Sequence, residues 1–155
     1  NSTAGANDSA LRTNLAGIRS AIDLYAQQHG GTYPGAATSA GGACPAPSTP
    51  GTGLLNTPEA LQEQLRYYSN NAGQTCSVSD VPPGGPVEFP FGPYIKSDIP
   101  PNPVTSDPTI TVVTTGDLAM GGAAAGGGWR YDTTSGKFIA DDTNADGAGT
   151  AYDTY

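Results

Sequence analysis

The C-terminal segment contains a regular series of oxygen-bearing side chains. Asp142, Asn144 and Asp146 occupy the first, third and fifth positions of a run whose sixth residue is glycine and whose twelfth is Asp153. Calcium prefers about six to eight hard oxygen ligands, and alternate residues of a tight turn can direct side chains toward one centre. The spacing predicts a calcium-binding loop whose side-chain ligands are Asp142, Asn144, Asp146, Thr150 and Asp153, with the carbonyl of Ala148 beside them. The alternative is a solvated turn, because such turns are common without metal.

Signals for catalysis are weak. His29, the only histidine, is predicted at the end of a helix, where a cation at the helix C-terminus explains it. Glu59 and Glu63 lie one helical turn apart, a spacing more typical of a solvated face than of an acid–base pair. The glycine-rich run 121–128 lacks the Lys-Ser/Thr ending of a phosphate loop. We therefore expect no enzymatic activity, and Tyr67 is the aromatic residue that we expect in a surface contact.

Composition and charge limit the possible functions. The 155 residues fit one domain, 1–155, with a modest core, because only 36% of them are hydrophobic while 22 are glycine and 14 proline. The net charge is −8, and ten of the 14 acidic residues follow residue 79. This charge disfavours binding to nucleic acid or to an anionic membrane surface. The sequence given has no apolar run long enough to span a membrane.

The first part of the chain predicts one long amphipathic helix. Over Ala10 to Pro34, apolar residues recur at helical spacing and form one stripe, which consists of Leu11, Leu15, Ile18, Ile22 and Tyr25. Asp8 or Ser9 can cap its start, and two glycines followed by Pro34 end it. One face of this helix must therefore pack on another element.

Shorter elements are expected in the rest of the chain. Asn56 or Thr57 can cap a second helix that carries Leu61, Leu65 and Tyr68 on one face and ends within 70–73. Residues 35–53 are expected to be a connector with slight burial. The proline-rich residues 78–108 are expected to lack regular structure, with Tyr94 and Ile95 as buried anchors. Residues 109–114 predict a strand, and 129–132 with 137–140 predict a hairpin that turns at Gly136.

Four segments, in this order, carry a family resemblance. They are the leading helix with its Gly-Thr-Tyr-Pro ending, ALQEQLRYYSN at 60–70, FGPYIKSDIPPNP at 91–103, and GGWRYDTTSGKFIA at 127–140. The chain resembles the soluble part of type IV pilin-like proteins, and within that group the major pseudopilin, the G-type subunit of bacterial type II secretion systems. Gly-Pro-Tyr-Ile-Lys followed by Ile-Pro-Pro-Asn-Pro is the most specific of these motifs.

The resemblance implies an α+β fold in which the long N-terminal helix packs on a small antiparallel β-sheet with long loops. It implies a structural subunit that polymerises into a filament with other pilin-like subunits and works with secretion-system assembly proteins. Members of the family are anchored in the inner membrane through an apolar first half of the helix, which is missing from this sequence. The expected location is the periplasm or the cell surface, and we expect this soluble part alone to be a monomer.

The expected compartment also bears on the cysteines and on calcium. Outside the cytoplasm a disulfide between Cys44 and Cys76 is favoured, whereas the alternative is two unrelated free thiols. Major pseudopilins as a group bind calcium in a C-terminal loop, which adds to the case for the loop described above. Two other functions remain open, a type IV pilus subunit for adhesion or motility and a secreted calcium-dependent binding module.

Overall fold

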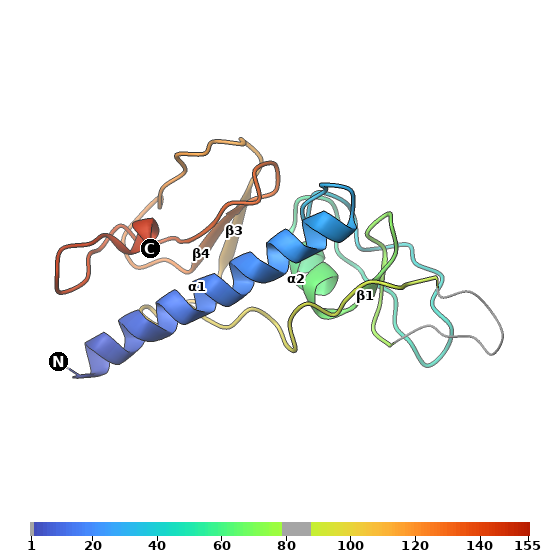
Figure 1. The fold of residues 1–155 in the computed structure, drawn as a ribbon, viewed down its shortest axis with the longest axis horizontal. Helices are drawn as coiled ribbons and strands as arrows, with labels where there is room; N and C mark the ends of the chain where they lie inside the picture. Colours follow the sequence, from blue (N-terminus) through green and yellow to red (C-terminus); the bar gives the residue numbers. More distant parts are fainter. Residues whose placement is uncertain (1, 79–87) are drawn as a thin grey trace. The chain divides into compact units, whose positions relative to one another are not determined.

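The computed structural model describes residues 2–78 and 88–155 and has an α+β fold. Its contacts divide the chain into two compact units, one made of the residues up to Ser20 together with Ile99–Tyr155, the other of Ala21–Asp98. The single domain, 1–155, stays a prediction. The elements, in chain order (Figure 1), are α1 Ser2–Gln28, α2 Pro58–Arg66, β1 Tyr68–Ser69, β2 Thr75–Cys76, β3 Ile110–Val113, β4 Trp129–Asp132, β5 Phe138–Ala140 and the short 3-10 helix η1 Tyr152–Thr154.

Helix α1 begins earlier than the capping signals predict. It runs from Ser2, so that Asp8 and Ser9 lie inside the helix and cap nothing. No proline interrupts the residues before Ala10, and the single Gly5 costs a helix only about 1 kcal/mol. The predicted end is confirmed: Gly30 and Gly31 have φ of 65° and 91°, and the Gly31 amide donates to the carbonyl of Ala26 at 2.8 Å.

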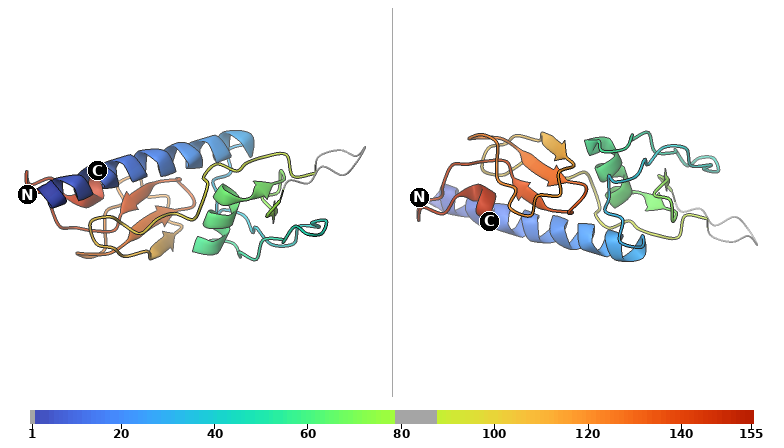
Figure 2. Two further views of the ribbon diagram at one scale, coloured as in Figure 1. Left: turned by 90° about the horizontal axis from the view of Figure 1, so that it is seen from below. Right: turned by 90° about the horizontal axis from the view of Figure 1, so that it is seen from above.

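The apolar stripe of α1 is buried as predicted. All five of its residues, Leu11, Leu15, Ile18, Ile22 and Tyr25, are at most 5% exposed. The first three belong to the unit that contains β3, β4 and β5. Both views of Figure 2 show the first part of α1 beside that sheet. The last two residues belong to the other unit, so α1 is the one described helix that contributes to both cores.

The sheet of the first unit is mixed, not purely antiparallel. Its order is β3-β4-β5; β4 and β5 form the predicted antiparallel hairpin, with Gly136 at φ 75°, but β3 pairs with β4 in parallel. Parallel neighbours need a connection of about a dozen residues or more. Residues 114–128 form this connection. The alternation of residues along a strand does not reveal whether the next strand pairs with it in parallel or antiparallel.

In the second unit, α2 starts as predicted and ends early. The Thr57 side chain accepts a hydrogen bond from the Ala60 amide, and Pro58 occupies the first turn. Tyr68, predicted on the helix, instead lies in β1, which pairs with β2 in antiparallel register. The reason is Asn70, whose Oδ1 accepts from the amides of Ala72 and Gln74 and thereby forms the turn of a hairpin.

The connector 35–53 is more buried than its composition predicts. Ser39 is fully buried, and Gly51 and Gly53 are buried as well. Side chains of α2 hold this segment. The buried amide of Gln64 accepts from the Gly35 amide and donates to the carbonyls of Ala37 and Gly73, while the Glu63 carboxylate accepts from the amides of Thr52 and Gly53.

The proline-rich segment follows its prediction in part. Within the described residues 88–108 no helix or strand forms, whereas the residues before Glu88 that belong to this prediction lie partly outside the described chain. The predicted anchors Tyr94 and Ile95 are only half-buried. Ile99 and Asn102 are buried instead. The side-chain Nδ2 of Asn102 donates to the Gly128 carbonyl and its Oδ1 accepts from the Val104 amide, which fixes the turn after the two prolines.

None of the helices in the described ranges 2–78 and 88–155 has the length and apolar content needed to cross a membrane.

A disulfide joins Cys44 to Cys76 across a sequence separation of 32 and encloses α2, as predicted. Replacing both cysteines, C44A/C76A, should lower the free energy of unfolding by about 3 to 4 kcal/mol, because the unfolded chain regains the entropy of that loop. Urea denaturation monitored by circular dichroism measures the change. A reducing agent should shift the midpoint of the wild type and leave the variant unchanged; equal midpoints of the two oxidised proteins would contradict the prediction.

Candidate functional site

The predicted calcium loop folds into a narrow antiparallel hairpin. The Asp153 amide donates to the Asp142 carbonyl at 3.0 Å, the Tyr152 amide to the Asn144 carbonyl at 2.9 Å, and the Asp146 amide to the Thr150 carbonyl at 2.9 Å. Its tip is the turn 147–149, where Gly149 has φ 88°. The hairpin therefore sets four of the five predicted ligands in two pairs, Asp142 opposite Asp153 and Asp146 opposite Thr150, whereas Asn144 lies opposite Tyr152.

The carboxylates of this hairpin accept hydrogen bonds from backbone amides. Asp142 is 1% exposed, and its Oδ1 accepts from the amides of Gly126 and Asn144 at 2.9 and 3.0 Å. Asp153 Oδ2 accepts from the Gly122 amide at 2.8 Å. The glycine-rich run 121–128 thus supplies donors to both of these acidic residues.

Asp146 forms the most extensive set of contacts. Its Oδ1 accepts from the amides of Ala148 and Thr150, and its Oδ2 accepts from the Tyr155 hydroxyl at 2.5 Å. The hydrogen bond from Tyr155, followed by the one from the Thr150 amide, holds the pKa of Asp146 below its usual value. This carboxylate is therefore ionised at neutral pH with all of these donors in place.

Calcium binding by the loop stays a prediction. In this conformation of the described chain, no three acidic, histidine or cysteine side chains come together as a metal-ligand group. A calcium ion needs about six to eight oxygen atoms, and the oxygen atoms of Asp146 already have protein donors. The five residues are neighbours through their backbone, but the three aspartates among them form no such group in the described chain.

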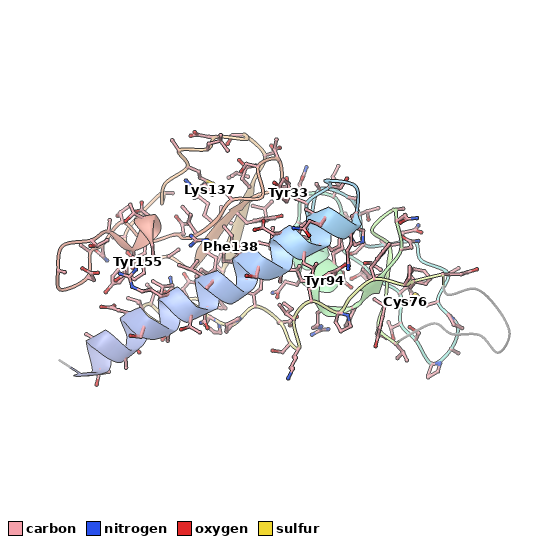
Figure 3. All side chains as sticks on the ribbon, in the orientation of Figure 1. Tyr33, Cys76, Tyr94, Lys137, Phe138 and Tyr155 are labelled. Carbon is pink, nitrogen blue, oxygen red and sulfur yellow. A yellow bond between two sulfur atoms is a disulfide. The ribbon has the colours of Figure 1, made fainter. Side chains whose placement is uncertain are left out.

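Helix α1 holds the C-terminal segment through three polar side chains, and this role was not predicted for any of them. Asp8 Oδ1 accepts from the Tyr152 hydroxyl at 2.8 Å, and the Arg12 guanidinium lies over the Tyr155 ring at 3.7 Å from its centroid. Arg19 donates to the carbonyls of Phe138 and Tyr155 at 3.0 and 2.8 Å. Figure 3 labels Phe138 and Tyr155 beside this helix.

These contacts also raise two tyrosine pKa values. The pKa of Tyr152 rises to about 12, chiefly because its hydroxyl donates to the Asp8 carboxylate, and burial raises that of Tyr155 to about 12 as well. The sequence does contain a sign of the contact between α1 and the C-terminal segment, because Asp8, Arg12 and Arg19 lie at helical spacing beside the apolar stripe.

In the second unit, His29 is a buried neutral residue and not the cation that its position at the end of the helix suggests. It is 7% exposed, and its ring stacks on Tyr25 with the centroids 3.6 Å apart. Nδ1 lies 2.7 Å from the Tyr25 carbonyl and Nε2 lies 3.0 Å from Ser69 Oγ, so Nδ1 carries the proton and Nε2 accepts. Burial lowers the pKa of His29, against smaller opposing effects of the carbonyls of Tyr25 and Asn70.

A shallow cleft in the same unit contains the other residues considered for chemistry. Arg66 and Asp98 form an ion pair at 3.0 Å, and the Arg66 guanidinium lies over the Tyr67 ring at 4.5 Å. Glu59 lies exposed at the rim, whereas Glu63 accepts from the Thr52 and Gly53 amides. The two glutamates thus have different surroundings.

Comparison with known proteins adds no relative. No model of a known protein family, no curated protein and no solved structure matches the chain. The function must therefore be argued from the residues and the fold.

The buried His29 predicts how stability depends on pH. In the unfolded chain its pKa is about 6.5, whereas in the folded protein it is lower, so the unfolded state binds more protons between these two values. The free energy of unfolding should therefore be maximal above about pH 6.5 and should fall as the pH decreases toward the lowered pKa. Urea titrations between pH 7.5 and 5 measure this slope.

The matched variant is H29F, which keeps an aromatic ring beside Tyr25 and cannot be protonated. Since His29 is the only histidine in the sequence, the variant should lose the slope over this pH range. Identical slopes for the two proteins would show that another group is responsible.

Proposed function

We propose that the chain is a structural subunit of a type II secretion pseudopilus, which assembles into a filament for protein export. The observation that supports this most is α1, a helix of 27 residues whose apolar stripe is buried in a small sheet-containing unit and in a loop-rich one. The motifs around residues 60–70, 91–103 and 127–140 support the same reading. In this proposal the subunit catalyses no reaction.

The contacts of α1 suit a helix that must stay attached to the rest of its subunit when subunits assemble into a filament. Here Asp8, Arg12 and Arg19 bind the C-terminal segment, in addition to the apolar burial of Leu11 and Leu15. The first part of α1 is therefore held from two sides, by apolar packing and by polar contacts.

The proposed setting follows from the same resemblance. The partners are other pilin-like subunits and secretion-system assembly proteins, and the location is the periplasm or the cell surface, with an inner-membrane anchor before assembly. The Cys44–Cys76 disulfide supports a compartment outside the cytoplasm, because disulfides persist in oxidising environments. We propose that the soluble part alone is monomeric and does not bind nucleic acid.

Genetic deletion tests this function directly. Deleting the gene in the source bacterium should leave exported proteins trapped inside the cell, and a plasmid copy should restore export. Electron microscopy with an antibody against residues 88–155 should detect filaments when the protein is overproduced. Loss of adhesion or motility with normal export would favour the type IV pilus subunit instead, and a mutant that keeps all of these activities would contradict both proposals.

Calcium is the ligand proposed for the C-terminal hairpin, and titration tests it. Adding calcium to chelator-treated protein should release or absorb a saturable heat and raise the melting temperature; at a hundredfold excess over Kd the gain is about 2.7 kcal/mol. D153N should weaken this response, while its amide oxygen can still accept from the Gly122 amide. Magnesium serves as the control ion. No heat together with an unchanged melting temperature would contradict calcium binding and the secreted calcium-dependent module with it.

A further inference from the structure

His29 lies where three parts of the second unit meet. Its ring stacks on Tyr25 of α1 at an interplanar angle of 8°, and the tilted ring of Phe91 packs against it with the centroids 4.8 Å apart. Its Nε2 accepts a hydrogen bond from Ser69, a residue of β1. A single side chain therefore contacts the end of α1, the hairpin of β1 and β2, and the segment that contains Phe91.

Segment 91–95 covers the ring and has little regular structure. It belongs to no helix or strand apart from one bridge, in which Phe91 and Ser69 exchange backbone hydrogen bonds of 2.9 and 3.1 Å. The Tyr94 amide donates to the Leu65 carbonyl at 2.8 Å. Phe91 and Tyr94 are only half-buried, so each contacts the buried histidine on one side and solvent on the other. Regions with few buried contacts and few backbone hydrogen bonds open locally at low free energy, so this segment is the cover that opens first.

The surroundings of the ring do not neutralise a positive charge. Among the residues that the structure describes, no acidic side chain forms a hydrogen bond or an ion pair with His29. The titratable groups that face it are the hydroxyls of Tyr25 and Tyr94, and both stay uncharged in acid and at neutral pH because burial raises the pKa of each. The carbonyls of Tyr25 and Asn70 favour the cation less than burial disfavours it. A protonated ring is thus a buried cation without a partner ion, which is costly.

Protonation also changes the hydrogen bond between His29 and Ser69. In the neutral ring Nδ1 donates to the Tyr25 carbonyl and Nε2 accepts from the Ser69 hydroxyl. A protonated ring donates from both nitrogens, so the Ser69 hydroxyl must turn its hydrogen toward another acceptor. Displacement of segment 91–95 removes both difficulties, because water then hydrates the charge and accepts from Nε2.

We propose that His29 is a pH-sensitive latch, which holds segment 91–95 closed while the ring is neutral and releases it when the ring is protonated. The opening is local. It exposes the inner faces of Phe91 and Tyr94, while α2 and the sheet β3-β4-β5 keep their structure. This device differs from the pH dependence of global unfolding predicted above, because only the segment around Gly-Pro-Tyr moves, and it does not rest on the proposed secretion function.

Amide exchange measured by NMR on the isotopically labelled 155-residue chain tests the latch. Rates are divided by those of an unstructured peptide at the same pH, which removes the intrinsic pH dependence of exchange. The folded pKa of His29 lies below its open value of about 6.5, so opening becomes more favourable as the pH falls below 6.5. Protection of the Phe91 and Tyr94 amides should therefore fall by about three- to tenfold between pH 7.5 and 5.5.

Low concentrations of urea separate local opening from unfolding. At pH 5.5 the exchange of Phe91 and Tyr94 should be insensitive to urea, because a local opening exposes little surface. The amides of α2 and β4 should exchange more slowly, at rates that rise with urea. Urea-dependent exchange of Phe91 and Tyr94 at the same protection as α2 would show that His29 acts only on the whole fold, and the latch would be wrong.

Three variants test the role of the ring. H29F and H29Q are neutral at every pH in this range, so protection at Phe91 and Tyr94 should be equal at pH 7.5 and 5.5. The matched control is Y94F, which removes the hydrogen bond from the Tyr94 hydroxyl to Gln28 and keeps the histidine. It should lower protection of the segment at both pH values and keep the pH dependence. A pH dependence that persists in a folded H29F or H29Q would overturn the proposal.

Titration of the ring provides a test in the wild type that needs no variant. The chemical shift of the Cε1 proton of His29 reports protonation directly, since this is the only histidine in the sequence. The loss of protection at Phe91 and Tyr94 should accompany it. A ring that becomes protonated while the protection of these amides stays constant would show that the closed structure accommodates the charge, and the latch would be wrong.

Discussion

Because most of this chain lies outside helices and strands, its backbone N–H and C=O groups need partners other than a regular ladder. A buried amide without a hydrogen bond costs about 1 to 3 kcal/mol, and long loops contain many such groups. Side chains provide the partners. Gln64 and Glu63 hold the connector 35–53, and Asn102 holds the turn after the two prolines. Among the described residues no buried side-chain nitrogen or oxygen lacks a hydrogen-bond partner.

The same requirement explains the C-terminal hairpin. Aspartates spaced two residues apart are suited to a calcium loop, but they are equally suited to accept from backbone amides nearby. Here Asp142 and Asp153 accept hydrogen bonds from backbone amides of the glycine-rich run 121–128. Asp146 accepts from the Thr150 amide at the tip of the hairpin. The excess of acidic residues in the C-terminal half is thus partly explained by their role as hydrogen-bond acceptors for the backbone amides of loops. A metal ion would have to compete with donors that are already bound.

Apolar burial is concentrated on α1 and on a few short elements. The helix has one continuous apolar stripe. Leu11 and Leu15 are part of the core of the unit with the mixed sheet, and Tyr25 is part of the core of the unit with α2. The sheet contributes large aromatic side chains, with Trp129 and Phe138 at a centroid distance of 5.2 Å. A chain with so little hydrophobic sequence relies on these positions and on the disulfide to remain folded.

The sequence by itself determined the elements whose signals are local. The stripe of α1, its glycine ending, the Thr57 cap and the hairpin turn at Gly136 each depend on residues within a few positions of one another. Tertiary structure decided what depends on distant partners. The parallel pairing of β3 with β4, the buried and neutral His29, and the contacts of Arg12 and Arg19 with Tyr155 join residues far apart in the chain. Local spacing does not encode such contacts, because they arise only when the loops have closed.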